Sequence, residues 1–244
     1  MRVPKVQGTI RRRLLVNFRV EPDVIQRLLP APFKPKLHNA KAIAGICLIR
    51  LENIRPKRFP KLVGISSENA AHRIAVVWDK AGAQREGVYI PRRDTGSWLN
   101  HLAGGRIFPG EHHRAKFDVH DEGDQISLRM RSADGRINVR VVGTTASELP
   151  GTSSFASVEE VSRFFEAGSL GYSATSAGGR LDGLILKTLS WRVDPLRIDE
   201  VFSSYFSDPL IFPEGSVSFD CALIMRNIAH EWHAASELYV EGAA

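Results

Sequence analysis

Cysteine and long apolar runs are both scarce in this sequence. The 244 residues include only two cysteines, Cys47 and Cys221, and both lie in apolar segments. This number excludes a disulfide-rich fold and the paired-cysteine motifs of zinc and redox sites. No stretch approaches the about 20 apolar residues of a membrane-spanning helix, and the N-terminal segment lacks the apolar region of a signal peptide. We therefore expect a cytoplasmic protein with free thiols and no membrane partner.

The sequence also lacks the motifs of common cofactor sites. It contains no Gly-x-Ser-x-Gly elbow, no phosphate-binding P-loop and no dinucleotide fingerprint. His230–His233 has the wrong spacing for a zincin helix, and neighbouring histidines such as His112 and His113 point to opposite faces of a strand. A metal site through His72 or His101 is the less favoured interpretation, because a pocket histidine more often titrates or forms hydrogen bonds. We expect neither a metal nor another cofactor.

Lysine is rare compared with arginine. The net charge of +6 arises from 24 arginines and nine lysines against 27 acidic residues. The basic residues are scattered, Arg11–Arg13 being the one triplet, and no aromatic platforms accompany them, so we expect no nucleic-acid partner. Arginine-rich sites also suit small carboxylates and phosphates, because the guanidinium group can bind two oxygens at once.

Local patterns predict many strands and a few short helices in one domain spanning residues 1–244. Alternating apolar positions around two turns predict an antiparallel three-stranded meander over residues 115–141. Because strands outnumber helices and do not alternate regularly with them, we predict an α+β fold, mainly β, around a curled antiparallel sheet or barrel. Further strands are expected at 43–51, 70–78, 87–91, 184–193 and 217–226, and helices at 21–29, 157–168 and from Asp194 to about Tyr205.

Two polar segments lie at the ends of predicted strands, one at the start of strand 70–78 and one just after strand 87–91. Glu68 and His72 share one face by alternation, and they form an acid/base pair if that face lines a barrel; the alternative is a solvated strand entrance. Arg92 and Arg93 are candidates for an anion clamp at the mouth of the barrel; the alternative is a solvated turn. Because adjacent residues of a strand point in different directions, at most one of the two arginines faces a pocket, and the other is expected to pair with Asp94.

The segment from Gly104 to His113 is the densest in polar groups. Glycines at both ends allow close backbone approach, and between them lie Arg106, Glu111, His112 and His113. We take Arg106 and His112 as binding candidates, together with His72 and the two arginines above. Glu68, Glu111 and His113 are the candidates for proton transfer.

Several segments together resemble an uncharacterised YqjF-like family of the acetoacetate decarboxylase-like superfamily. The resemblance extends from about Val16 to His233 and implies a curled barrel or cone with outer helices and a polar interior cavity. It is carried by NFRVEPDVIQRLLPAPFKPKL, AGICLIRLENIRP, SSENAAHRIAV, EGVYIPRRDT, GGRIFPGEHHRAKF and ALIMRNIAHEWH.

The resemblance also identifies a difference in chemistry. In the decarboxylases a lysine pair follows a Gly-aromatic-Pro step, and one lysine forms a Schiff base. Here Phe108-Pro109 is followed by Gly110-Glu111, and neither residue can do so. Lys116 lies on the polar face of the next predicted strand, where we expect it to face solvent. The resemblance matches Glu68 to an acidic pocket residue of the decarboxylases.

Two classes of function remain open. The first is an enzyme that performs acid/base chemistry on a small carboxylate or oxo acid without a lysine Schiff base. The second is a non-catalytic protein that binds or senses a small anionic molecule in the same pocket. Folds of this type often assemble, so a homo-oligomer stays among the expected partners.

Overall fold

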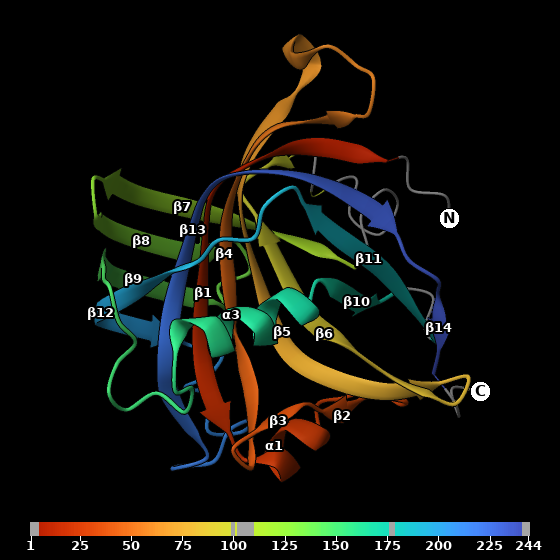
Figure 1. Cartoon of the computed structure of the whole chain (residues 1–244), viewed down its shortest axis with the longest axis vertical. Helices are drawn as coiled ribbons and strands as arrows, with labels where there is room; N and C mark the ends of the chain where they lie inside the picture. The colour runs from red at the N-terminus through yellow and green to blue at the C-terminus, as the bar shows by residue number, and fades with distance from the viewer. Residues whose placement is uncertain (1–4, 99–100, 102–109, 176–178, 241–244) are drawn as a thin grey trace.

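The computed structural model describes residues 5–98, 101, 110–175 and 179–240, and its strands form one curled 14-stranded sheet (Figure 1). No helix within these ranges is long and apolar enough to cross a membrane. The longer strands are β1 (Val6–Val20), β4 (Lys41–Pro56), β5 (Ile65–Lys80), β6 (Ala83–Thr95), β7 (His112–Glu122), β8 (Gln125–Ser132), β9 (Asn138–Thr145), β11 (Arg180–Thr188), β12 (Asp194–Ser203) and β13 (Val217–Ala234). The shorter elements are α1 (Pro22–Gln26), β2 (Lys34–Pro35), β3 (Leu37–His38), a 3-10 turn (Lys61–Val63), α3 (Val158–Ala167), β10 (Leu170–Ala174) and β14 (Leu238–Tyr239).

The strand pairings form two closed circuits that share part of the sheet. In the larger circuit β6, β7, β8, β9, β12, β13, β1, β4 and β5 pair in that order, and β5 pairs with β6 to close it. The smaller circuit runs from β6 to β10 and β11 and returns through β13, because β11 also pairs with β13. The shared strands β13, β1, β4, β5 and β6 therefore separate two compartments, called the large barrel and the small barrel below.

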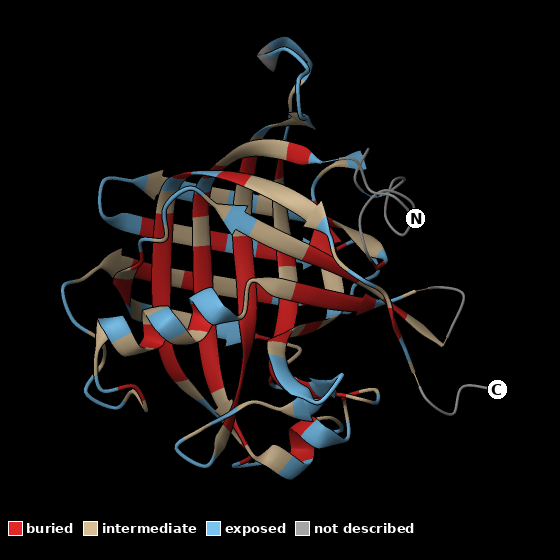
Figure 2. Ribbon diagram, turned by 45° about the vertical axis from the view of Figure 1, so that its right-hand side comes forward, coloured by how far each residue is buried: buried red, intermediate tan, exposed pale blue. Residues whose placement is uncertain are grey.

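The shared strands are apolar on both faces because each face is covered. In β1, Leu14 and Val16 belong to the core of the large barrel, whereas Leu15 belongs to a second core in the small barrel. Figure 2 shows the buried residues as bands that cross neighbouring strands. This double burial accounts for the uninterrupted apolar runs of β4 and β13, which antiparallel strands with one solvated face do not show. α3 covers the second core and buries Val161 and Phe165 in it.

Much of the predicted architecture is confirmed. The fold is mainly β with a curled sheet and short helices, and the meander pairs as expected, with Phe117 opposite Met130 and Met130 opposite Val139. α3 begins at the predicted cap, where the backbone N–H of Glu160 donates to Ser157 Oγ at 3.2 Å. The sheet is mixed rather than purely antiparallel, since β6 pairs in parallel with both β7 and β10.

Several elements differ from the sequence prediction, β12 and β1 being the longest of them. Residues 194–203 form strand β12, not a helix. The helix was predicted from Asp194-Pro195 as its opening pair, and a bulge between Ile198 and Glu200 interrupts the alternation by which a strand is recognised. The edges of β9 and β13 supply the hydrogen-bond partners that draw this segment into the sheet. β1 was not predicted at all, because its three consecutive arginines obscure the apolar pattern.

Candidate anion-binding cavity

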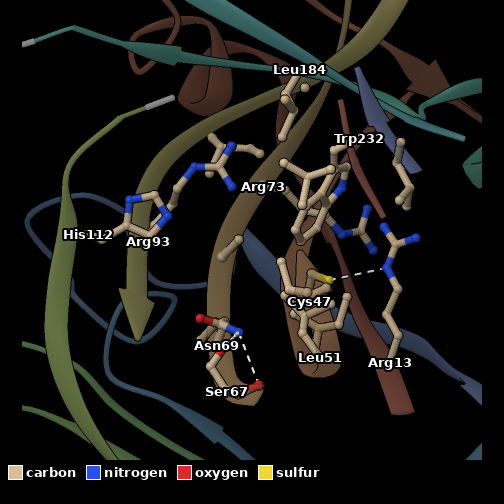
Figure 3. Close-up of a pocket in the computed structure, with 18 of the residues that line it drawn as sticks. Arg13, Cys47, Leu51, Ser67, Asn69, Arg73, Arg93, His112, Leu184 and Trp232 are labelled. Atoms are coloured by element: carbon tan, nitrogen blue, oxygen red, sulfur yellow. Dashed lines mark hydrogen bonds between the residues drawn. The ribbon is translucent and has the colours of Figure 1, made fainter. Parts of the chain in front are cut away.

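A cavity of about 440 Å³ lies inside the small barrel. Its volume falls within the range of small-molecule sites. One wall, from β5, β6 and the start of β7, carries polar groups, and the wall from β11 and β13 is apolar (Figure 3). The polar wall contains Ser67, Asn69, Arg73, Arg93 and His112, and the apolar wall contains Leu184, Leu186 and Trp232. Cys47 and Arg13 line the cavity from β4 and β1.

Four arginines line the cavity, and three of them, Arg13, Arg73 and Arg93, lie near Cys47, each held by neutral groups. Arg13 donates from Nε to Cys47 Sγ at 3.3 Å. Arg73 donates from Nη2 to Asn17 Oδ1, and its guanidinium carbon lies 4.5 Å from the centre of the Phe165 ring. Arg93 donates from Nε to Ser173 Oγ at 3.2 Å. Uncharged partners thus position all three cations.

Within the part of the chain that the structure describes, no ion pair balances the positive charge of this set. None of the three arginines forms an ion pair with a carboxylate of the described residues, although other arginines do. Burial lowers the pKa of Arg73 and of Arg93 to about 10, so both stay charged at neutral pH. Arg73 also has a buried Nε without a hydrogen-bond partner in the described chain. Because buried charges are normally paired, the positive charge of these arginines favours the binding of an anion in the cavity.

Strand register explains why these residues meet. Cys47, Ala71, Arg93 and His112 stand opposite one another on β4, β5, β6 and β7. Their side chains therefore share the small-barrel face, since residues paired across strands lie on the same face. His112 donates from Nδ1 to the carbonyl oxygen of Gly110 at 3.1 Å. Burial, reinforced by the Arg93 cation, lowers the pKa of His112 to about 3, so its ring is neutral at pH 7.

The alternation predicted for the adjacent pairs is present. Arg92 turns to the large-barrel side and contacts the carboxylate of Asp94, with Nη2 2.9 Å from Oδ1, while Arg93 lines the cavity. Arg92 also contacts Asp134 at 2.9 Å, and His113 Nδ1 lies 3.8 Å from the same carboxylate. Of the predicted site residues that the structure describes, Arg93 and His112 alone line this cavity.

Glu68 and His72 do not form the acid/base pair considered from the sequence. They lie four residues apart on β5, a separation of about 13 Å along a strand. Glu68 accepts from Arg12 Nη2 at 2.7 Å. His72 is fully buried, with its ring 4.6 Å from that of Tyr205, and burial lowers the pKa of His72 to about 3. A shared face does not bring residues four apart on a strand into contact, and the acid/base role of these two residues stays a prediction.

The remaining predicted groups lie elsewhere. Glu111 is exposed just before β7, and Arg106 lies outside the described residues. Lys116 is exposed on β7, as expected from the sequence. Within the described residues no cluster of three or more histidine, cysteine or acidic side chains is placed to hold a metal ion.

Sequence reasoning missed Arg13 and Arg73 as cavity residues. Both were visible as members of polar segments, the arginine triplet and the stretch around His72. The missing information was which face of each strand borders the cavity. Arg12 and Arg13 lie on opposite faces of β1, so that Arg12 pairs with Glu68 and Arg13 reaches Cys47.

Comparison with known proteins places these features in a family. The model of the DUF2071 family, described as an uncharacterized conserved protein (COG2071), matches residues 7–175. A search of curated protein sequences finds no match.

Solved structures of the acetoacetate decarboxylase type share the fold. The acetoacetate decarboxylase of Legionella pneumophila superposes with a TM-score of 0.61 at 12% identity, over 96% of this chain and 88% of that one. An acetoacetate decarboxylase-like enzyme from Sphingomonas wittichii RW1 gives 0.59 at 12% identity, over 99% and 94%. The enduracididine biosynthesis enzyme MppR, in complex with pyruvate, gives 0.59 at 9% identity, over 99% and 91%. At these identities the similarity establishes the fold alone. The chemistry has to be inferred from the residues of the cavity.

Proposed function

The chain belongs to the DUF2071 family, and we propose that its small barrel binds a small organic acid between Arg13, Arg73 and Arg93. The observation that carries this proposal is the convergence of three cations on one cavity without a carboxylate partner among the described residues. A carboxylate ligand would supply the missing charge. Guanidinium groups suit this task because their planar donors match the two oxygens of a carboxylate.

Oxo acids are the first class to test. MppR, which has a similar fold, is known in complex with pyruvate. The described lining of the cavity in this chain contains no lysine, so chemistry through a Schiff base has no amine there. If the protein is an enzyme, we expect acid/base chemistry on the bound acid, with neutral His112 as a hydrogen-bonding group beside it.

A non-catalytic carrier or sensor is the second candidate. It is favoured by the placement of two predicted proton-transfer groups, since Glu68 is paired with Arg12 and His113 lies beside Asp134, both away from the cavity. Glu111, the third group, is exposed in front of β7. Their roles in proton transfer remain predictions.

The test is calorimetric titration of pyruvate and acetoacetate into the wild-type protein, Arg93→Gln and Arg129→Gln. Arg129 is exposed on β8 and serves as the matched control. Loss of one charged hydrogen-bond donor should weaken binding about 10- to 100-fold in Arg93→Gln, with Arg129→Gln unchanged. Equal affinity in all three proteins would remove Arg93 from the site. Proton NMR of the incubated acid separates the candidates, because a carrier returns it unaltered and an enzyme does not.

A further inference from the structure

We infer that the acid bound in the small barrel is amphiphilic, a monocarboxylate with an extended apolar body. This inference rests on the proposed function and specifies its ligand class. It follows from the division of the cavity wall, from the length of the cavity and from the arrangement of its cations.

The wall of the cavity that β11 and β13 form is apolar. Leu184 and Leu186 on β11 and Trp232 on β13 face the cavity, and Ile90 of β6 adjoins them. Polar oxo acids of three or four carbons would leave this surface in contact with water. An apolar chain would cover it, which is favourable in proportion to the area removed from water.

The cavity is also long. Its lining positions on β5 run from Ile65 to Arg73, which is about 26 Å at the usual rise of a strand. The lining thus extends along the strand, so the cavity is elongated rather than compact. A ligand that contacts both the arginines and the far apolar positions must therefore be elongated.

A single anionic group is sufficient for this ligand. Arg55, the one further arginine of the described lining, lies at the end of β4. It donates from Nε to the Phe59 carbonyl oxygen at 3.0 Å and from Nη1 to the Asn53 carbonyl oxygen at 2.8 Å. Two of its donors thus serve the hairpin backbone. The arginines that cluster are those near Cys47, which favours a ligand with one carboxylate at that end of the cavity.

The experiment is a calorimetric series of straight-chain acids from acetate to decanoate, with octanol as the uncharged counterpart of octanoate. We expect each added methylene to tighten binding about fourfold until the cavity is filled, and octanol to bind at least tenfold more weakly than octanoate. Binding of all acids with equal affinity would overturn the amphiphile inference and leave the anion site standing. Absence of binding by every acid, or equal binding of octanol and octanoate, would overturn the proposed function itself.

Variants locate the apolar body. Leu186→Trp fills the apolar side and should weaken octanoate at least tenfold while leaving acetate unchanged. Leu189→Trp is the control, because Leu189 is exposed three residues further along the chain. Ile90→Trp tests the same wall from β6, so the inference does not depend on one variant folding. Octanoate affinity that is unchanged in both folded cavity variants would contradict the inferred position of the chain.

Discussion

Arg92 and Arg93 are neighbours in β6 and belong to different compartments. Arg92 turns into the large-barrel side, where its guanidinium contacts the fully buried carboxylate of Asp94 at 2.9 Å. Arg93 turns into the small barrel, where Ser173 Oγ accepts its Nε–H at 3.2 Å. One arginine thus completes a buried ion pair and the other provides a cation without a carboxylate partner in the described chain.

The two arginines should therefore respond differently to the same substitution. Arg92→Gln leaves Asp94 buried without its cation, which should cost about 3 kcal/mol and lower Tm by about 6–12 °C. Arg93→Gln should change Tm little and abolish tight binding of the acid. Thermal unfolding and calorimetric titration of both variants provide the measurement. A loss of binding with intact stability in Arg92→Gln would reverse the assignment.

The sequence predicted these two orientations without predicting the cavity. Alternation along a strand is local, so Arg92 and Arg93, or His112 and His113, could be assigned to opposite faces from the sequence alone. Which face borders a cavity depends on β10 and β11, which cover one side of the shared strands through pairings distant in sequence. Arg13 and Arg73 were missed for this reason.

The failure at β12 has a similar origin. A bulge between Ile198 and Glu200 interrupts the alternation of this strand, and a bulge cannot be recognised without the partner strand. The meander β7–β8–β9 was predicted well because its pairings join neighbouring segments through short turns. Local patterns were therefore sufficient where contacts are local.

The two thiols should differ in reactivity toward alkylating agents. Cys47 lines the cavity next to Arg13, whereas Cys221 is fully buried and burial raises its pKa to about 12. We expect iodoacetate to modify Cys47 in the folded protein and to leave Cys221 intact, because only a reachable thiolate reacts. Peptide mass spectrometry after limited alkylation measures the two sites. Saturating octanoate should protect Cys47, and equal labelling of both cysteines would contradict the arrangement.

Replacing Phe165 of α3 should weaken the binding of the acid. Its ring lies beneath the guanidinium of Arg73 at 4.5 Å and is buried in the small-barrel core. Phe165→Leu should destabilise the protein by about 1–2 kcal/mol and weaken acid binding severalfold, because Arg73 loses its support. Phe164→Leu is the matched control, since Phe164 contacts Lys36 instead. Urea unfolding and titration of both variants test this. Identical affinities would show that Asn17 alone positions Arg73.

Buried histidines should make stability fall in mild acid. Burial lowers the pKa of His72 to about 3 and that of His230 to about 4, whereas both titrate near 6.5 in the unfolded chain. Between these values the unfolded state binds more protons, so stability is complete above about pH 6.5 and declines as pH falls toward the folded pKa. For His72 the loss between pH 7 and pH 5 is about 2 kcal/mol. Urea unfolding at pH 5, 6 and 7 measures it, and His72→Gln should remove this share of the pH dependence. An unchanged slope in that variant would mean that the pKa of His72 is the same in the folded and unfolded states.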